Sequence, residues 1–139
     1  MAISDLLPRK AMGSKTRGQT LHDRLDYDQK KEKTEDGELV SSYMCCPETA
    51  AEEFEMSKLL YETSTGRSQP KDRDIIAYRI IQSFRPGEIT PEEANKLGYE
   101  LAMKFTKGKH QFIVSTHVDK AHIHNHVEFN STNLECDGK

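Results

Sequence analysis

Residues 111–130 constrain the fold of this chain more than any other segment, because they contain two runs with the alternation typical of β-strands. The runs cover residues 111–117 and 122–130, and four residues link them. Two strand-like runs joined by so short a link predict an antiparallel hairpin. Neighbouring side chains along each strand then point to opposite faces of the sheet.

The remaining segments alternate between strand-like and helix-like patterns. Apolar and aromatic runs predict strands over residues 3–7, 39–45 and 75–84. Capping signals predict three helices: one that starts at Thr20 with Asp23, one that follows Pro47 and ends near Gly66, and one from Thr90 to Gly108. The order β-α-β-α-β-α-β-β predicts an α+β fold, with an antiparallel sheet of about five strands and helices packed on one face.

The length of 139 residues is typical of one domain, and the catalytic domain is expected to span residues 1–139. The chain stops nine residues after Asn130 without a closing element, so we expect it to be truncated at its C-terminal end. No apolar run approaches the roughly 18 residues of a membrane span. Three cysteines, two of them adjacent, form no disulfide framework, which favours the cytoplasm.

Charge is unevenly distributed along the chain, although the net charge is only −3. Residues 1–33 hold eight Lys or Arg against five Asp or Glu, and residues 64–87 hold five against two. Residues 34–63 hold one against eight. The basic segments therefore predict a surface that faces phosphates, and solvated faces without a partner remain the alternative.

Four of the six histidines lie within residues 117–126. His122, His124 and His126 share one face of the second predicted strand, opposite a face with Ile123, Val127 and Phe129 on which Asn125 is a polar exception. Cross-strand neighbours in a hairpin lie about 4.5–5.5 Å apart, so His117 of the first strand can converge with two of these histidines.

Three imidazoles arranged in this way predict a metal site that keeps open positions for water or substrate. The H-x6-H-x-H spacing favours His117, His124 and His126 as ligands, with His122 beside them. Asp119 would either orient a ligand imidazole or form the turn between the strands. Three imidazoles suit Mn, Co, Ni or Zn better than Mg.

Three segments together resemble a known family: LDYDQKKEKT (25–34), CCPETAAEEF (45–54) and IIQSFRPGEITPEEANKLGYELAMKFTKGKHQFIVSTHVDKAHIHNHVEFNST (80–132). They are similar to relaxases of mobilisable and conjugative elements, which are members of the HUH endonucleases. The likeness begins near residue 20, and it is strongest to relaxases of Gram-positive integrative elements. The PGEITPEEAN segment combined with H-x-D-x2-H-x-H-N-H is highly specific for this family.

The resemblance implies site-specific nicking of one DNA strand through a 5′-phosphotyrosine intermediate. It assigns the metal ligands to His117, His124 and His126, and the nucleophile to Tyr27 in a motif similar to DY-x5-KT. From the residues alone, Tyr27 stands off the apolar stripe of its helix, unlike a tyrosine that packs in a core. The resemblance also implies Mg²⁺ or Mn²⁺ as the cofactor, single-stranded DNA at an origin of transfer as the partner, and accessory relaxosome proteins.

Two positions depart from the family pattern. Asn125 is polar where the HUH triplet has a hydrophobic residue, and the hydrophobic-centred triplet is instead His122-Ile123-His124. Arg79 stands where relatives often have histidine. The residue that deprotonates the nucleophile is not identified by the sequence; the candidates are His22, Asp26 and Asp119.

Three other functions remain alternatives. An HUH replication initiator or transposase would use the same chemistry on different DNA. A three-histidine metallohydrolase would use water in place of Tyr27. A DNA-binding remnant would have lost catalysis altogether.

Overall fold

The computed structural model describes residues 3–11, 15–30, 32–34, 37–70, 73–119 and 121–138. Its elements, in chain order, are β1 (Ile3–Lys10), α1 (Arg17–Asp28), β2 (Val40–Tyr43), the short 3-10 helix η1 (Pro47–Thr49), α2 (Ala50–Thr65), β3 (Ile75–Ser83), α3 (Pro91–Thr106), β4 (Phe112–His117) and β5 (His124–Asn130). The predicted order of strands and helices and the predicted α+β class are confirmed.

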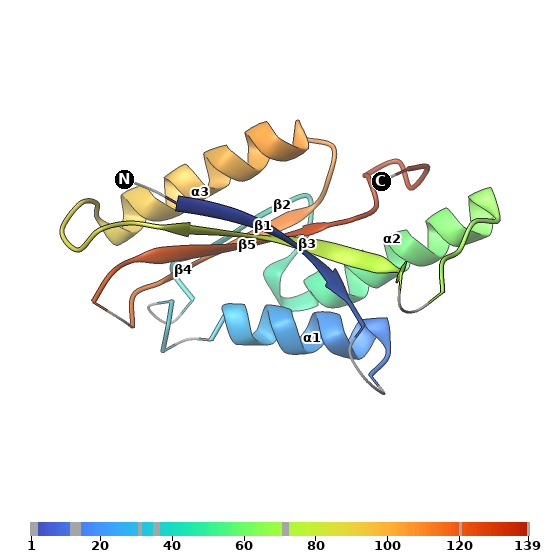
Figure 1. The fold of residues 1–139 in the computed structure, drawn as a ribbon, viewed down its shortest axis with the longest axis horizontal. Helices are drawn as coiled ribbons and strands as arrows, with labels where there is room; N and C mark the ends of the chain where they lie inside the picture. Colours follow the sequence, from blue (N-terminus) through green and yellow to red (C-terminus); the bar gives the residue numbers. More distant parts are fainter. Residues whose placement is uncertain are drawn as a thin grey trace.

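The five strands form one antiparallel sheet in the order β1-β3-β5-β4-β2 (Figure 1). The predicted hairpin is its centre, because β5 pairs with β4 on one side and with β3 on the other. Ser83 of β3 and His117 of β4 both lie opposite His124. The histidine-bearing strand is therefore enclosed by neighbours along its length.

Helices cover both faces of the sheet, so the expectation of one covered face is wrong. In Figure 1, α3 lies on one side of the sheet, and α1 and α2 lie on the other. The reason is that β4 is buried along its whole length and has apolar side chains on both faces. Phe112 and Val114 pack with Ala102 of α3, whereas Ile113 packs with Leu25 of α1 and Phe54 of α2.

The first helix begins earlier than the sequence predicted. Thr16 caps α1, because its hydroxyl accepts from the backbone N–H of Gln19 at 3.1 Å and the Gln19 side chain accepts from the N–H of Thr16 at 2.9 Å. Thr20, the predicted start, is buried inside the helix. A Thr-x-x-Gln capping box thus prevails over the weaker Thr-x-x-Asp signal. The predicted cap of α3 at Thr90 is confirmed, with Glu93 completing its box.

Within the described part of the chain, no helix combines the length and the apolar character that a membrane span requires.

Candidate metal centre

Three imidazoles gather on the face of the sheet that α1 covers. His117 ends β4, and His124 and His126 lie on β5, so the antiparallel register sets His117 directly opposite His124. The centroid of the His117 ring lies 5.0 Å from that of His124 and 4.2 Å from that of His126. One ligand nitrogen from each histidine lies within 4.8 Å of the other two. This spacing suits a single ion bound by all three imidazoles.

The fourth histidine of the segment lies outside this cluster. Strand β5 begins at His124, so the predicted strand start at His122 is two residues too early. His122 is exposed in the turn before the strand, and its ring centroid is 5.5 Å from that of His124. The geometry thus groups the H-x6-H-x-H set rather than the hydrophobic-centred triplet.

The donor chemistry of the cluster fits a divalent metal ion. Nδ1 of His124 and Nδ1 of His126 are both buried, and neither has a hydrogen-bond partner among the described residues. Burial, reinforced by the charge of His117, lowers the pKa of His124 to about 4 and that of His126 to about 3. Both rings are therefore neutral near pH 7, and each has one nitrogen lone pair that a divalent transition-metal ion can accept.

Asp28 contacts two of these rings, and sequence reasoning missed it. Its main-chain carbonyl accepts a hydrogen bond from Nε2 of His117 at 2.7 Å, and its Oδ1 lies 3.6 Å from Nδ1 of His126. The helical spacing of the sequence does contain a signal for Asp28. Leu21, Leu25 and Asp28 are spaced i, i+4 and i+7, which sets all three on the inner stripe of α1.

Tyr27 lies next to the imidazole cluster. Its ring is 43% exposed at the end of α1, with its centroid 6.3 Å from that of His117 and the two planes nearly perpendicular. The Nζ atoms of Lys30 and Lys33 lie 5.3 and 5.2 Å from the Tyr27 centroid. Tyr43 and Tyr78, in contrast, stack on aromatic rings of the α3 face.

Asp119 contacts a lysine. Its carboxylate pairs with Nζ of Lys33 at 2.6 Å, and the neighbouring backbone N–H of Val118 donates to the carbonyl of Lys33 at 2.8 Å. These contacts join the β4–β5 turn to the segment that follows α1, and so hold the end of that helix beside the histidines. Lys33 of the DY-x5-KT motif therefore has a structural explanation.

The other sequence candidates are scattered around the site. His22 pairs with Glu52 of α2 at 2.9 Å, and Asp26 is exposed on α1.

Arg79 of β3 lies opposite Glu128, on the same sheet face as the histidines, and burial lowers the pKa of its guanidinium. Glu128 is buried and binds Arg9 at 3.0 Å; burial raises the pKa of Glu128 to about 7.

Ion pairs within the chain take up much of the predicted basic surface. Arg9, Lys15, Arg17 and Lys33 pair with the carboxylates of Glu128, Asp23, Glu62 and Asp119, respectively. The excess of positive charge in residues 1–33 thus overstates the number of cations available to phosphates. Lys30 differs from these four residues, because it is exposed and its Nζ lies over the Tyr27 ring.

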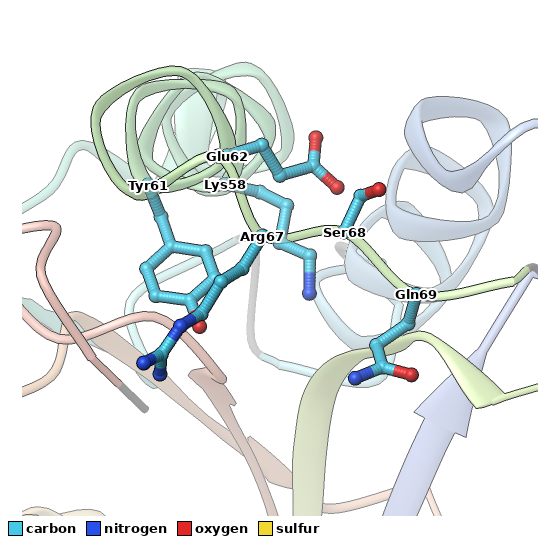
Figure 2. Close-up of a pocket in the computed structure, with 7 residues that line it drawn as sticks. Lys58, Tyr61, Glu62, Arg67, Ser68 and Gln69 are labelled. Carbon is cyan, nitrogen blue, oxygen red and sulfur yellow. The ribbon is translucent and has the colours of Figure 1, made fainter.

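A hollow of about 350 Å³ lies far from the histidines, between the end of α2 and residues 66–69 (Figure 2). Lys58, one of its lining residues, forms an ion pair with Asp74 at 2.6 Å and donates a hydrogen bond to the carbonyl of Ile75. Ile75 begins β3, whereas the histidines lie beside the other end of that strand, about 25 Å away at the usual rise per residue. The hollow is thus separate from the imidazole cluster.

Comparison with known proteins identifies the family of this chain. Residues 22–139 match the relaxase family described as the MobA/VirD2-like nuclease domain. The chain belongs to this family. The relaxase resemblance of the sequence is therefore confirmed.

Two similar proteins illustrate the extent of the match. The chain is 42% identical over 102 residues to the protein rlx of Staphylococcus aureus, a match that covers 73% of this chain and 30% of that protein. It is 40% identical over 81 residues to the group II intron-interrupted relaxase LtrB of Lactococcus lactis, covering 53% of this chain and 14% of that protein. The matched region thus spans less than a third of either relative.

Proposed function

We propose that this relaxase domain nicks one strand of DNA, with Tyr27 as nucleophile and with His117, His124 and His126 as ligands of Mg²⁺ or Mn²⁺. The observation that carries the proposal is the juxtaposition at the end of α1. One helix holds an exposed tyrosine ring 6.3 Å from the His117 ring, and in the same cluster Nδ1 of His124 and Nδ1 of His126 are buried without a hydrogen-bond partner among the described residues. A nucleophile and the imidazoles that would hold an electrophilic metal ion therefore lie side by side.

The chain itself supplies the nucleophile and the three metal ligands. A bound divalent ion would neutralise the negative charge that makes a phosphodiester inert to nucleophiles. The phenolic oxygen of Tyr27 forms the new bond to phosphorus, and the bond from phosphorus to the 3′ oxygen breaks. The 3′ oxygen leaves as a hydroxyl, taking up a proton in exchange for the one that Tyr27 loses. One ester replaces another of similar energy, so the strand can be rejoined.

The substrate that fits this chemistry is single-stranded DNA at an origin of transfer, and the biological role is to start mobilisation of a DNA element. Family membership supports this assignment, as do the relaxase names of the relatives. Relaxosome accessory proteins are the expected further partners. Lys30 lies beside the Tyr27 ring, where its charge would attract a backbone phosphate toward the nucleophile.

A covalent-adduct assay tests the proposal. The chain is incubated with single-stranded oligonucleotides that carry the origin of the element, with Mn²⁺ or EDTA, and is run on a denaturing gel. We expect a metal-dependent adduct that Tyr27→Phe abolishes, because the phenolic oxygen is lost while the ring remains. Tyr78→Phe is the matched control, since Tyr78 stacks on Phe129 at the other face of the sheet.

Two outcomes would contradict the proposal. An adduct that persists in Tyr27→Phe would assign the nucleophile to another tyrosine. Cleavage without any adduct would favour the metallohydrolase, in which water attacks.

A further inference from the structure

We propose that Asp28 is the positioning residue of the metal centre: one residue holds two of the three imidazoles, His117 through its main-chain carbonyl and His126 through its carboxylate. The inference rests on the proposed function, because it assumes that the three histidines bind a metal ion. Neither the family match nor the sequence motifs assign a role to this residue.

The contact to His117 defines the protonation of that ring. A carbonyl oxygen only accepts hydrogen bonds, so the 2.7 Å contact requires a proton on Nε2 of His117. In a neutral imidazole the lone pair then resides on Nδ1, which makes Nδ1 the atom of His117 suited to bind a metal. The carbonyl belongs to the last residue of α1, so the backbone of this helix sets the orientation of the ring.

The contact to His126 is longer and is made by the carboxylate of Asp28. Oδ1 of Asp28 lies 3.6 Å from Nδ1 of His126, and the Asp28 carboxylate is 3% exposed. Its other oxygen, Oδ2, is buried without a hydrogen-bond partner among the described residues. Burial and the charge of Glu128 raise the pKa of Asp28. In its ionised form, the Asp28 carboxylate favours the tautomer of His126 in which Nδ1 carries the proton, which leaves Nε2 of His126 to bind a metal ion and makes it more basic.

The charges of Arg9, Arg79 and Arg24 favour the ionised form of Asp28, but no hydrogen bond or ion pair joins any of them to it within the described part of the chain. Arg9 reaches Glu128 with two nitrogens, at 3.0 and 3.1 Å. Arg79 lies opposite Glu128 in the sheet. Asp28 instead contacts the imidazoles of His117 and His126, which makes orientation of these rings the better account of its position.

The place of Asp28 in the chain links the metal centre to the nucleophile. Tyr27 and Asp28 are consecutive, and the helix directs the first toward solvent and the second beneath the histidines. Any shift of the end of α1 moves both residues together. The distance between the phenolic oxygen and a metal ion held by these histidines would therefore be set by one short piece of backbone.

The test compares Mn²⁺ affinity by calorimetry in the whole chain for wild type, Asp28→Asn and Asp28→Leu. Both variants keep the carbonyl, so they isolate the carboxylate. We expect about tenfold weaker binding in Asp28→Asn and nearer a hundredfold in Asp28→Leu, because an amide oxygen still accepts a hydrogen bond and a leucine does not. Asp26→Asn, two residues away and exposed on the same helix, should bind Mn²⁺ as wild type does.

A second readout separates orientation of the rings from a general structural role. Two-bond ¹H–¹⁵N spectra of the metal-free protein report which nitrogen of each imidazole is protonated. In Asp28→Leu the proton of His126 should redistribute between Nδ1 and Nε2, whereas His117 should keep its proton on Nε2. Thermal unfolding of each variant, followed without metal, identifies any loss of folding.

Unchanged Mn²⁺ affinity in a folded Asp28→Leu variant would overturn the inference, as would an unchanged His126 tautomer. Failure of the proposed function looks different. If His124→Ala binds Mn²⁺ as tightly as wild type does, the three-histidine site is wrong, whatever the Asp28 variants do.

Discussion

The two faces of the sheet bury polar side chains in opposite ways. On the α3 face, the amide of Asn125 donates to Gln82 at 2.9 Å and to the carbonyl of Ala94 at 2.7 Å, and its oxygen accepts from Thr116. Asn95 of α3 extends this network by donating to Thr116 at 3.0 Å. The polar groups at the centre of this face satisfy one another, as in an ordinary core.

The α1 face differs because several of its buried polar atoms have no hydrogen-bond partner in the described part of the chain. They are Oδ2 of Asp28, Nε of Arg79, Oγ of Ser115, and Nδ1 of His124 and of His126. A buried polar atom left unpaired costs about 1–3 kcal/mol, so a group of them in one place indicates a function. Neighbouring residues of β5 thus serve different ends: Asn125 stabilises the fold, and the histidines on either side of it are available to a ligand.

The largest expected effect tests the ligand role of the α1 face. His124→Ala should weaken Mn²⁺ binding by about 100-fold or more, because three ligands become two. The metal-free protein should unfold at nearly the same temperature, since Nδ1 of the lost ring has no hydrogen-bond partner among the described residues and the side chain is only half-buried. Calorimetry and thermal unfolding measure the two effects.

The control for this variant is His122→Ala, which removes an exposed ring 5.5 Å from that of His124. It should leave Mn²⁺ binding intact. A loss in His122→Ala as large as that in His124→Ala would show that the histidine of the turn is also a ligand.

A smaller effect tests the α3 face. Asn125→Ala leaves the carbonyl of Ala94 and the side chains of Gln82 and Thr116 without their partner, so it should destabilise the fold by about 2–3 kcal/mol. Chemical denaturation measures this loss. The folded fraction should still bind Mn²⁺ as wild type does, and a parallel loss of affinity would mean that the two faces are not independent.

Local sequence patterns predicted most of the fold. The alternation in β4 and β5 identified the hairpin, and the Thr90–Glu93 capping box identified the start of α3, because both signals depend on residues close in sequence. The second covered face could not be predicted in this way. It depends on Ile113 packing against two helices that precede it by more than 45 residues, and no local pattern contains that contact.

The site shows the same division. The three-histidine grouping follows from strand period and hairpin pairing, which are local. Asp28 was missed because its importance arises only when the end of α1 lies against β4 and β5. The pairing of Lys33 with Asp119 was missed for the same reason, since 86 residues separate the two in the chain.

The smallest predicted effect concerns pH and the α1 face in the absence of metal. Burial holds the pKa of His126 at about 3 in the folded protein, against about 6.5 in an unfolded chain. As the pH falls through 6.5, the unfolded chain takes up a proton that folded His126 does not, so this residue destabilises the fold progressively until about pH 3. Glu128 acts with the opposite sign, because its pKa is raised to about 7 and the stability linked to it is lost as the pH rises from about 4.5 to 7.

A comparison of wild type with His126→Gln isolates the contribution of the histidine, because Glu128 is common to both. Between pH 7.5 and 5.5 the free energy of unfolding of wild type should fall by about 1 kcal/mol relative to that of the variant. Denaturant titrations at several pH values, with EDTA present, measure the difference. If the free energies of unfolding of the two proteins changed in parallel with pH, the His126 imidazole would be as well solvated in the folded protein as in the unfolded chain. Burial of the histidines would then not distinguish the α1 face from the α3 face.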